Sequence, residues 1–225
     1  MNWFSVLKNG SSELELLIIT PLKHGDKVSE ETKKMVKKNS VDYEWVTIEN
    51  DGNPAHNTSL GYEIWNSNNS KRKKPKYIMK LDNDINSDKP FIDVLVNSLN
   101  NSNDNEAYAY CGFEFTGAIN VKFPAVNFDP YQLIMNNYIS FNSVIKREAL
   151  DSIGGFITDD KYFRLLDWAL WLKFLKNGYI GKPSFGVSFT AHASKGSVSA
   201  GSAEDYKIKH KAVYDDFINK ILIQP

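Results

Sequence analysis

Three short apolar runs, each followed by polar residues and then by a helical pattern, dominate the first half of the chain. The runs cover residues 14–20, 43–48 and 77–81. Runs of this length without polar alternation are typical of strands that are buried on both faces of a parallel sheet. Helical patterns follow them, over residues 26–39, 59–65 and 90–99. This alternation predicts an α/β fold of Rossmann-like type, with a mostly parallel central sheet and helices on both faces.

The second half of the chain is patterned less regularly. Strand-like segments cover residues 107–115, 138–145 and 179–192, and helical ones cover residues 146–153, 167–177 and 204–223. A loop of small residues is predicted over residues 194–201. Because neither a linker nor an internal repeat separates the halves, we expect residues 1–225 to form a single domain.

Composition excludes several classes of protein. The chain has 27 basic and 27 acidic side chains, so it has no net charge that would attract nucleic acid. Its single cysteine, Cys111, excludes an internal disulfide and fits a reducing compartment. No stretch approaches the roughly 18 apolar residues that a transmembrane helix needs. We therefore expect a cytoplasmic protein with no nucleic-acid partner and no transmembrane segment.

The third apolar run ends in two carboxylates, Asp82 and Asp84, that are one residue apart. Mg²⁺ and Mn²⁺ prefer such oxygen ligands and usually keep coordination positions free for substrate phosphates. A plain acidic turn is the alternative, because Asp and Asn are common in turns. The other two runs also end in polar residues, Thr20-Pro21 and the Asn-Asp-Gly of residues 50–52. Ligands bind outside the carboxyl ends of such strands, so this convergence favours a ligand site.

Other readings of the acidic and histidine residues fit less well. A calcium-loop register over residues 82–93 fails, because Ser87 stands where glycine is required and Pro90 interrupts the loop. The sequence has no phosphate-binding Gly-x-x-x-x-Gly-Lys loop and no histidine pair with zinc spacing. His192 is retained as a candidate ligand because it ends a predicted strand beside the small-residue loop.

Asp167 begins a helical pattern whose apolar face includes Trp168 and Trp171. A carboxylate at this position can simply cap the helix and interact with the positive end of its dipole. It can also act as a general base if burial against the tryptophans raises its proton affinity. The local sequence leaves both interpretations open.

Taken together, the motifs resemble those of family 2 glycosyltransferases with the GT-A fold, which use nucleotide sugars. The resemblance covers most of the chain, over residues 16–21, 45–52, 82–84, 142–156 and 166–173. The third of these matches the family's Asp-x-Asp motif, and the fourth ends in its Gly-Gly-Phe. The sequence departs from the family at Leu166, Ala169 and Lys173, where Glu, Asp and Arg are typical.

The resemblance implies roles for individual residues. Residues 1–112 would bind the nucleotide sugar and the metal, and residues 113–225 would bind the acceptor. Asp84 would ligate Mn²⁺ or Mg²⁺, and Asp167 would be the catalytic base. The nucleotide would be contacted by Thr20, Pro21, Asp51 and Asp82, and it would also be approached by His56 and Asn57. Further contacts to the metal would come from Asp82 and His192.

The function implied by the resemblance is transfer of a sugar, with inversion, from a UDP-linked donor to a hydroxyl of a glycan or glycoconjugate. The protein would act alone or within a larger glycan-synthesis machinery. The departures around Asp167 motivate an alternative, a non-catalytic module that binds sugar nucleotides or glycans. A nucleotidyltransferase is a further alternative, although residues 21–25 are a poor version of the basic glycine-rich loop that it needs.

Overall fold

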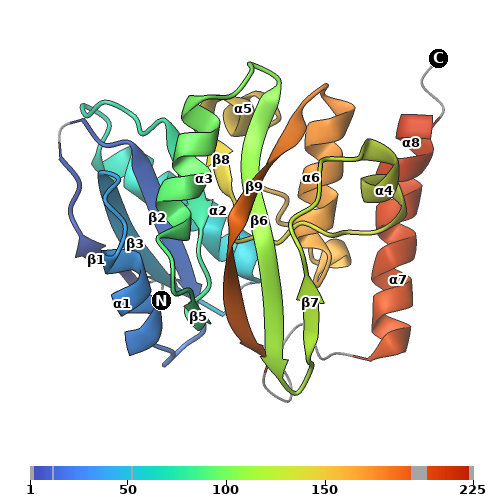
Figure 1. Cartoon of the computed structure of the whole chain (residues 1–225), viewed down its shortest axis with the longest axis horizontal. Helices are drawn as coiled ribbons and strands as arrows, with labels where there is room; N and C mark the ends of the chain where they lie inside the picture. The colour runs from blue at the N-terminus through green and yellow to red at the C-terminus, as the bar shows by residue number, and fades with distance from the viewer. Residues whose placement is uncertain (1–2, 12, 52, 194–201, 223–225) are drawn as a thin grey trace.

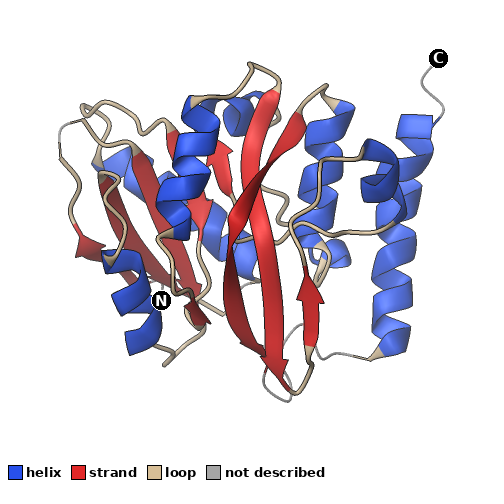
Figure 2. Cartoon of the chain, in the orientation of Figure 1, coloured by secondary structure: helices blue, strands red, loops and turns tan. Residues whose placement is uncertain are grey.

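The computed structural model describes residues 3–11, 13–51, 53–193 and 202–222. In these residues nine strands form one sheet in the order β1-β3-β2-β4-β8-β6-β9-β5, and β7 pairs with β6 (Figures 1 and 2). The strands are β1 (Trp3–Lys8), β2 (Leu16–Leu22), β3 (Tyr43–Glu49), β4 (Tyr77–Lys80), β5 (Ile85–Asn86), β6 (Glu106–Gly117), β7 (Val121–Phe123), β8 (Val144–Lys146) and β9 (Ile180–Ala193). The α/β class predicted from the sequence is confirmed.

The sheet is mixed, so the prediction of a mostly parallel sheet is wrong. The pairs β2–β3, β2–β4 and β6–β9 are parallel. The pairs β1–β3, β4–β8, β6–β8, β5–β9 and β6–β7 are antiparallel. A run of apolar residues shows that a strand is buried but not which way its neighbour runs, because distant segments decide the pairing.

Several strand assignments also differ from the sequence prediction. Strands β1, β5 and β7 were not predicted, and the strand predicted over residues 138–145 is wrong except at its end, where the three-residue β8 lies. Strand β6 runs through the predicted boundary at residue 112, so the two halves share one sheet. The single domain and its two functional halves stay predictions. The loop predicted over residues 194–201 lies outside the described residues.

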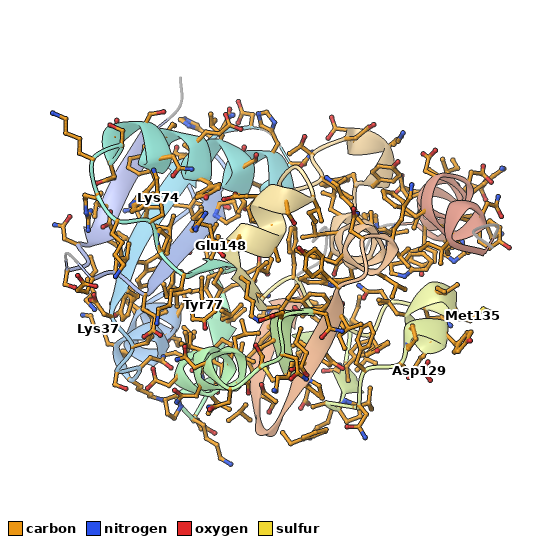
Figure 3. All side chains as sticks on the ribbon, turned by 90° about the horizontal axis from the view of Figure 1, so that it is seen from above. Lys37, Lys74, Tyr77, Asp129, Met135 and Glu148 are labelled. Carbon is orange, nitrogen blue, oxygen red and sulfur yellow. The ribbon has the colours of Figure 1, made fainter. Side chains whose placement is uncertain are left out.

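Helices cover both faces of the sheet, as Figure 3 shows from above. One face carries α1 (Glu30–Lys37) and α3 (Phe91–Asn100), and the other carries α2 (Pro54–Asn68), α5 (Arg147–Ser152), α6 (Leu166–Lys176) and α7 (Ala203–Val213). The chain also forms α4 (Pro130–Met135), a 3₁₀ turn (Asp160–Tyr162), a π-helical turn (Tyr214–Ile218) and α8 (Asn219–Leu222). Among the described residues, no helix is long and apolar enough to cross a membrane.

The capping residues explain where α2 begins. Asn53 accepts a hydrogen bond from the His56 N–H at 2.8 Å, and Pro54 occupies the first turn, where its missing N–H costs nothing. The helix therefore starts five residues before the predicted segment at residues 59–65. This earlier start places Asn57 in the first turn, beside the ends of the strands.

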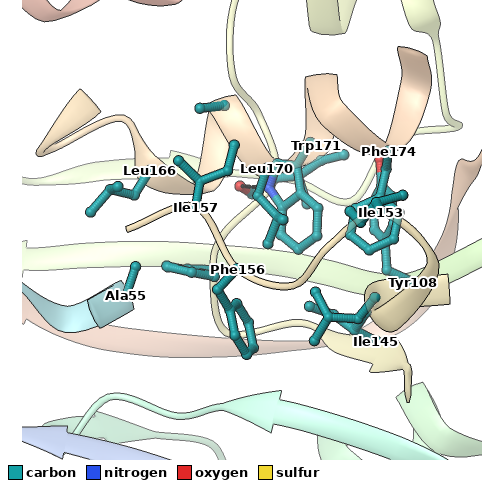
Figure 4. Packing of buried hydrophobic residues seen from close by; sticks show 14 of the residues in the cluster. Ala55, Tyr108, Ile145, Ile153, Phe156, Ile157, Leu166, Leu170, Trp171 and Phe174 are labelled. Carbon is teal, nitrogen blue, oxygen red and sulfur yellow. Dashed lines mark hydrogen bonds between the residues drawn. The ribbon is translucent and has the colours of Figure 1, made fainter. Parts of the chain in front are cut away.

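An aromatic cluster under α6 holds that helix against the sheet (Figure 4). The rings of Tyr108 and Trp171 stack with centroids 4.3 Å apart, and Phe174 lies 5.4 Å from Tyr108. The indole N–H groups of Trp168 and Trp171 donate to the carbonyls of Leu133 and Ile139 at 2.6 and 3.0 Å. The hydrogen bonds of the two indoles and the stacking of the rings fix the rotation of α6 about its axis. The position of Asp167 at its start is thereby determined.

Candidate active site

A cavity of about 500 Å³ opens at the carboxyl ends of β2 and β4, where the first turns of α2 and α6 and the end of β9 also meet. It is large enough for part of a nucleotide sugar. Predicted site residues in its wall are Pro21, Asn57, Asp82, Asp84, Asp167 and His192. Charged and polar residues in the wall that the sequence prediction missed include Lys23, Asp26, Lys80, Asn142 and Arg164.

Two residues predicted to bind the nucleotide lie elsewhere. Thr20 is fully buried, and its hydroxyl accepts a hydrogen bond from the Trp45 indole N–H at 2.9 Å. Asp51 is exposed in the turn after β3, outside the cavity wall. His56 is also exposed and outside the wall. The Thr20 hydroxyl therefore satisfies the buried Trp45 indole N–H, which would be costly to leave unpaired. In this structure Thr20 stabilises the sheet.

Asp82 is held by two protein partners. Asn142 donates from Nδ2 to Asp82 Oδ2 at 2.7 Å and accepts from the Asp82 backbone N–H at 2.8 Å. The Lys80 ammonium pairs with the other carboxylate oxygen, Oδ1. Both oxygens of Asp82 are therefore engaged before any ligand arrives. This arrangement suits a fixed hydrogen-bond acceptor, such as one for a ribose hydroxyl, better than an open metal ligand.

Asp84 faces the cavity near His192. Burial raises the pKa of Asp84, and the charge of Asp82 raises it further, while Lys80 and His192 oppose the shift. His192 stands on β9 opposite Thr116 of β6, and its ring packs against Gly117. A Cβ atom at residue 117 would lie 2.7 Å from His192 Cε1, so the glycine makes room for the imidazole.

The donor set can be compared with the needs of a divalent cation. Among the described residues, there is no group of three or more His, Cys, Asp or Glu side chains that could hold a metal ion by itself. Mg²⁺ is commonly held by one or two carboxylates together with substrate phosphates, so it does not need an all-protein cage. Asp84 and His192, both in the cavity wall, are therefore the candidate ligands for a cation that would also contact the oxygens of a diphosphate.

Asp167 lies in the first turn of α6 and faces the cavity. Its Oδ1 accepts a hydrogen bond from the Trp168 N–H at 2.8 Å, which satisfies one of the free N–H groups of that turn. Burial raises its pKa to about 6, while the Trp168 N–H, the charge of Lys80 and Asn137 act in the opposite direction. A carboxylate with this pKa is ionised at neutral pH and basic enough to accept a proton.

The residues that depart from the family pattern around Asp167 have packing roles. Leu166 lines the cavity, and Ala169 is fully buried. The Lys173 ammonium donates to the Gly155 carbonyl at 3.3 Å, and burial lowers its pKa. Asp167 is thus the carboxylate that this turn of α6 presents to the cavity.

Arg164 is a wall residue with an unusual backbone. Its φ of 79° lies in the left-handed region, where side chains other than glycine are strained. Its Nη1 donates to the Ser202 carbonyl at 2.8 Å and contacts Asp205, at the start of α7. The contact ties the turn before Asp167 to that helix. The local sequence contains no signal for this conformation.

A scan against protein-family models and a search of curated proteins gave no match for the sequence. Among solved structures, the chain is similar to S. aureus TarS. The structure of TarS 1-349 in complex with UDP-GlcNAc matches 90% of this chain and 66% of that chain, with a TM-score of 0.56 and 12% identity. The complex of TarS 1-349 with UDP matches 90% and 65%, with a TM-score of 0.55 and 11% identity.

A longer TarS structure matches 92% of this chain but 40% of that chain, with a TM-score of 0.55 and 12% identity. The chain therefore spans less than two thirds of the length of each of these TarS chains. TarS is a family 2 glycosyltransferase with the GT-A fold. At this level of identity the similarity concerns the fold alone, and it confirms the GT-A-like fold that the sequence motifs predicted.

Proposed function

We propose that the chain is a glycosyltransferase that moves a sugar from a UDP-linked donor to an acceptor hydroxyl of a glycan or glycoconjugate. One observation carries the proposal. A single cavity brings together Asp82 and Asp84, from the end of β4, and Asp167, from the start of α6. The charge of Asp82 raises the pKa of Asp84 and Lys80 opposes this, so a further cation or a ligand rich in donors would stabilise the ionised carboxylates.

The proposed donor occupies the cavity from the β2 side. Pro21 and Asn57 bound the space for the nucleoside, and Asp82 offers its fixed carboxylate to the ribose. Asp84 and His192 would hold Mn²⁺ or Mg²⁺ against the diphosphate. When bound, the cation stabilises the negative charge that develops on the leaving diphosphate. The TarS complexes with UDP and UDP-GlcNAc support the choice of a UDP-linked donor.

Asp167 is the proposed base. As the acceptor oxygen attacks the anomeric carbon, its proton passes to the Asp167 carboxylate, and the bond from the anomeric carbon to the diphosphate oxygen breaks. A single displacement of this kind inverts the anomeric centre. The first turn of α6 holds the carboxylate through the Trp168 N–H, so little reorganisation is needed for the proton transfer. The cytoplasmic location expected from the sequence stays a prediction.

Release of nucleoside diphosphate tests the proposal. The protein is mixed with Mn²⁺, an acceptor mixture and a panel of nucleotide sugars, and the nucleotide products are quantified. We expect UDP from at least one UDP-linked sugar. Pyrophosphate release would instead indicate a nucleotidyltransferase, and binding of the nucleotide sugar without any release would indicate a non-catalytic module. Failure of every nucleotide sugar to bind would refute the proposal.

A further inference from the structure

Lys80 is buried in the floor of the cavity. The residue is 5% exposed and is the last residue of β4. Among the described side chains it is the one lysine that is buried to this extent. Lysine is almost never fully buried unless it is paired, because removing an ammonium from water costs several kcal/mol. The proposed reaction as described above gives this cation no direct contact with the substrate.

The protein satisfies only part of the hydrogen-bonding capacity of Lys80. An ammonium carries three N–H donors. Among the described residues, its hydrogen-bond partner is Asp82, and the centroid of the Phe141 ring lies 5.2 Å from Nζ. An aromatic face attracts the charge but accepts no conventional hydrogen bond. Acceptors for the remaining donors must therefore come from the contents of the cavity.

The position of Lys80 indicates which part of a substrate would supply these acceptors. Its charge acts on both Asp84 and Asp167, opposing the effect of burial on each pKa. Lys80, Asp84 and Asp167 line the same cavity. In the proposed reaction the diphosphate lies at Asp84 and the acceptor hydroxyl at Asp167. The transferred sugar lies between the diphosphate and the acceptor hydroxyl, and therefore in the cavity that Lys80 also lines.

We infer that Lys80 is a sugar-contacting residue that donates a hydrogen bond to a hydroxyl or amide carbonyl oxygen of the transferred sugar. The inference rests on the proposed function and assigns to this chain a determinant of donor selectivity. The ion pair with Asp82 fixes the ammonium in place, so the contact is preorganised. A sugar without an oxygen at this point would leave a buried cation with unused donors, which disfavours its binding.

Comparison of UDP with an intact nucleotide sugar tests this role without requiring turnover. Calorimetry with Mn²⁺ and no acceptor would give the affinities of wild type and Lys80→Met for UDP and for the tightest-binding sugar of the panel. We expect Lys80→Met to lose about tenfold or more in affinity for the nucleotide sugar relative to UDP. Any disturbance of Asp82 affects the binding of both ligands, so it cancels in the ratio of the affinity for the nucleotide sugar to the affinity for UDP.

Two further variants make the experiment decisive. Lys146→Met removes a lysine at the end of β8 that bonds to the Asn103 carbonyl at 2.8 Å and is outside the cavity wall, and it should leave the ratio unchanged. If Lys80→Met does not fold, the double variant Lys80→Met/Asp82→Asn removes both charges of the pair and allows the same comparison.

The possible results separate the inference from the proposed function. Equal losses for UDP and the nucleotide sugar, or no loss for either, would overturn the inference and leave the proposed function standing. Absence of nucleotide-sugar binding by the wild type would refute both. A selective loss for the nucleotide sugar in the Lys80 variant, with Lys146→Met unchanged, would establish the contact.

Discussion

Replacement of Asp167 by Asn should stabilise the protein while it abolishes transfer. Burial shifts the pKa of Asp167 from 3.8 to about 6, so the folded state disfavours the ionised carboxylate. A raised carboxyl pKa means that the folded state binds protons more tightly than the unfolded state. Folding stability therefore falls as pH rises from about 4 to about 6, and the loss is complete at neutral pH.

The size of this effect follows from the shift. About two pKa units at about 1.4 kcal/mol each give an upper value of ~3 kcal/mol, and contact with water in the cavity reduces it, so we expect about 1–3 kcal/mol. Asparagine keeps an oxygen that can accept from the Trp168 N–H, so the first turn of α6 is retained. The gain in folding stability of Asp167→Asn over the wild type should be present at pH 7.5 and shrink toward zero near pH 4.

Urea unfolding of wild type and Asp167→Asn at several pH values measures this difference, and product formation measures transfer. We expect a loss of roughly 10² to 10⁴ in the transfer rate with UDP affinity unchanged. Asp51→Asn, at an exposed turn outside the cavity, is the matched control and should alter neither quantity. A stability difference that did not vary with pH, or retained transfer in Asp167→Asn, would refute the reasoning.

Three further outcomes are expected. The transfer rate of the wild type should fall about tenfold per pH unit below about pH 6, where Asp167 becomes protonated, and a flat profile from pH 5 to 7 would contradict its role as base. Asp84→Asn should weaken Mn²⁺-dependent UDP binding about tenfold or more in calorimetry, whereas Asp51→Asn should not, and equal effects would argue against the metal role. Thr20→Val should cost about 1–3 kcal/mol in urea unfolding by leaving the Trp45 indole N–H unpaired, and a matching loss of UDP affinity would show that Thr20 also serves the nucleotide.

Local pattern was sufficient to predict the strands that carry the first half of the site. Strands β2, β3 and β4 lie within a few residues of the predicted segments, because an uninterrupted apolar run has few alternatives to burial in a sheet. The pattern did not reveal β1 or the direction of β8. The place of both strands depends on pairing with segments far away in the sequence.

One missed site residue carried a signal in the sequence, and another did not. Lys80 is a charged residue inside the apolar run that ends at Asp82, and that exception to the pattern points to a buried ionic contact. Asn142 contacts Asp82 across 60 positions of sequence, and an asparagine within a segment predicted as a strand gives no sign of such a contact. Long-range hydrogen bonds of this type follow from the fold.

By itself the sequence determined that Asp82 and Asp84 end a buried strand and that Asp167 begins a helix with a broad apolar face, since both features depend on neighbouring residues. Only the tertiary structure decided what these carboxylates can do. Packing brings Lys80 and Asn142 to the two oxygens of Asp82, leaves Asp84 facing the cavity beside His192, and buries Asp167 enough to raise its pKa. Charge pairing and desolvation depend on distances between elements, and those distances exist only once the chain has folded.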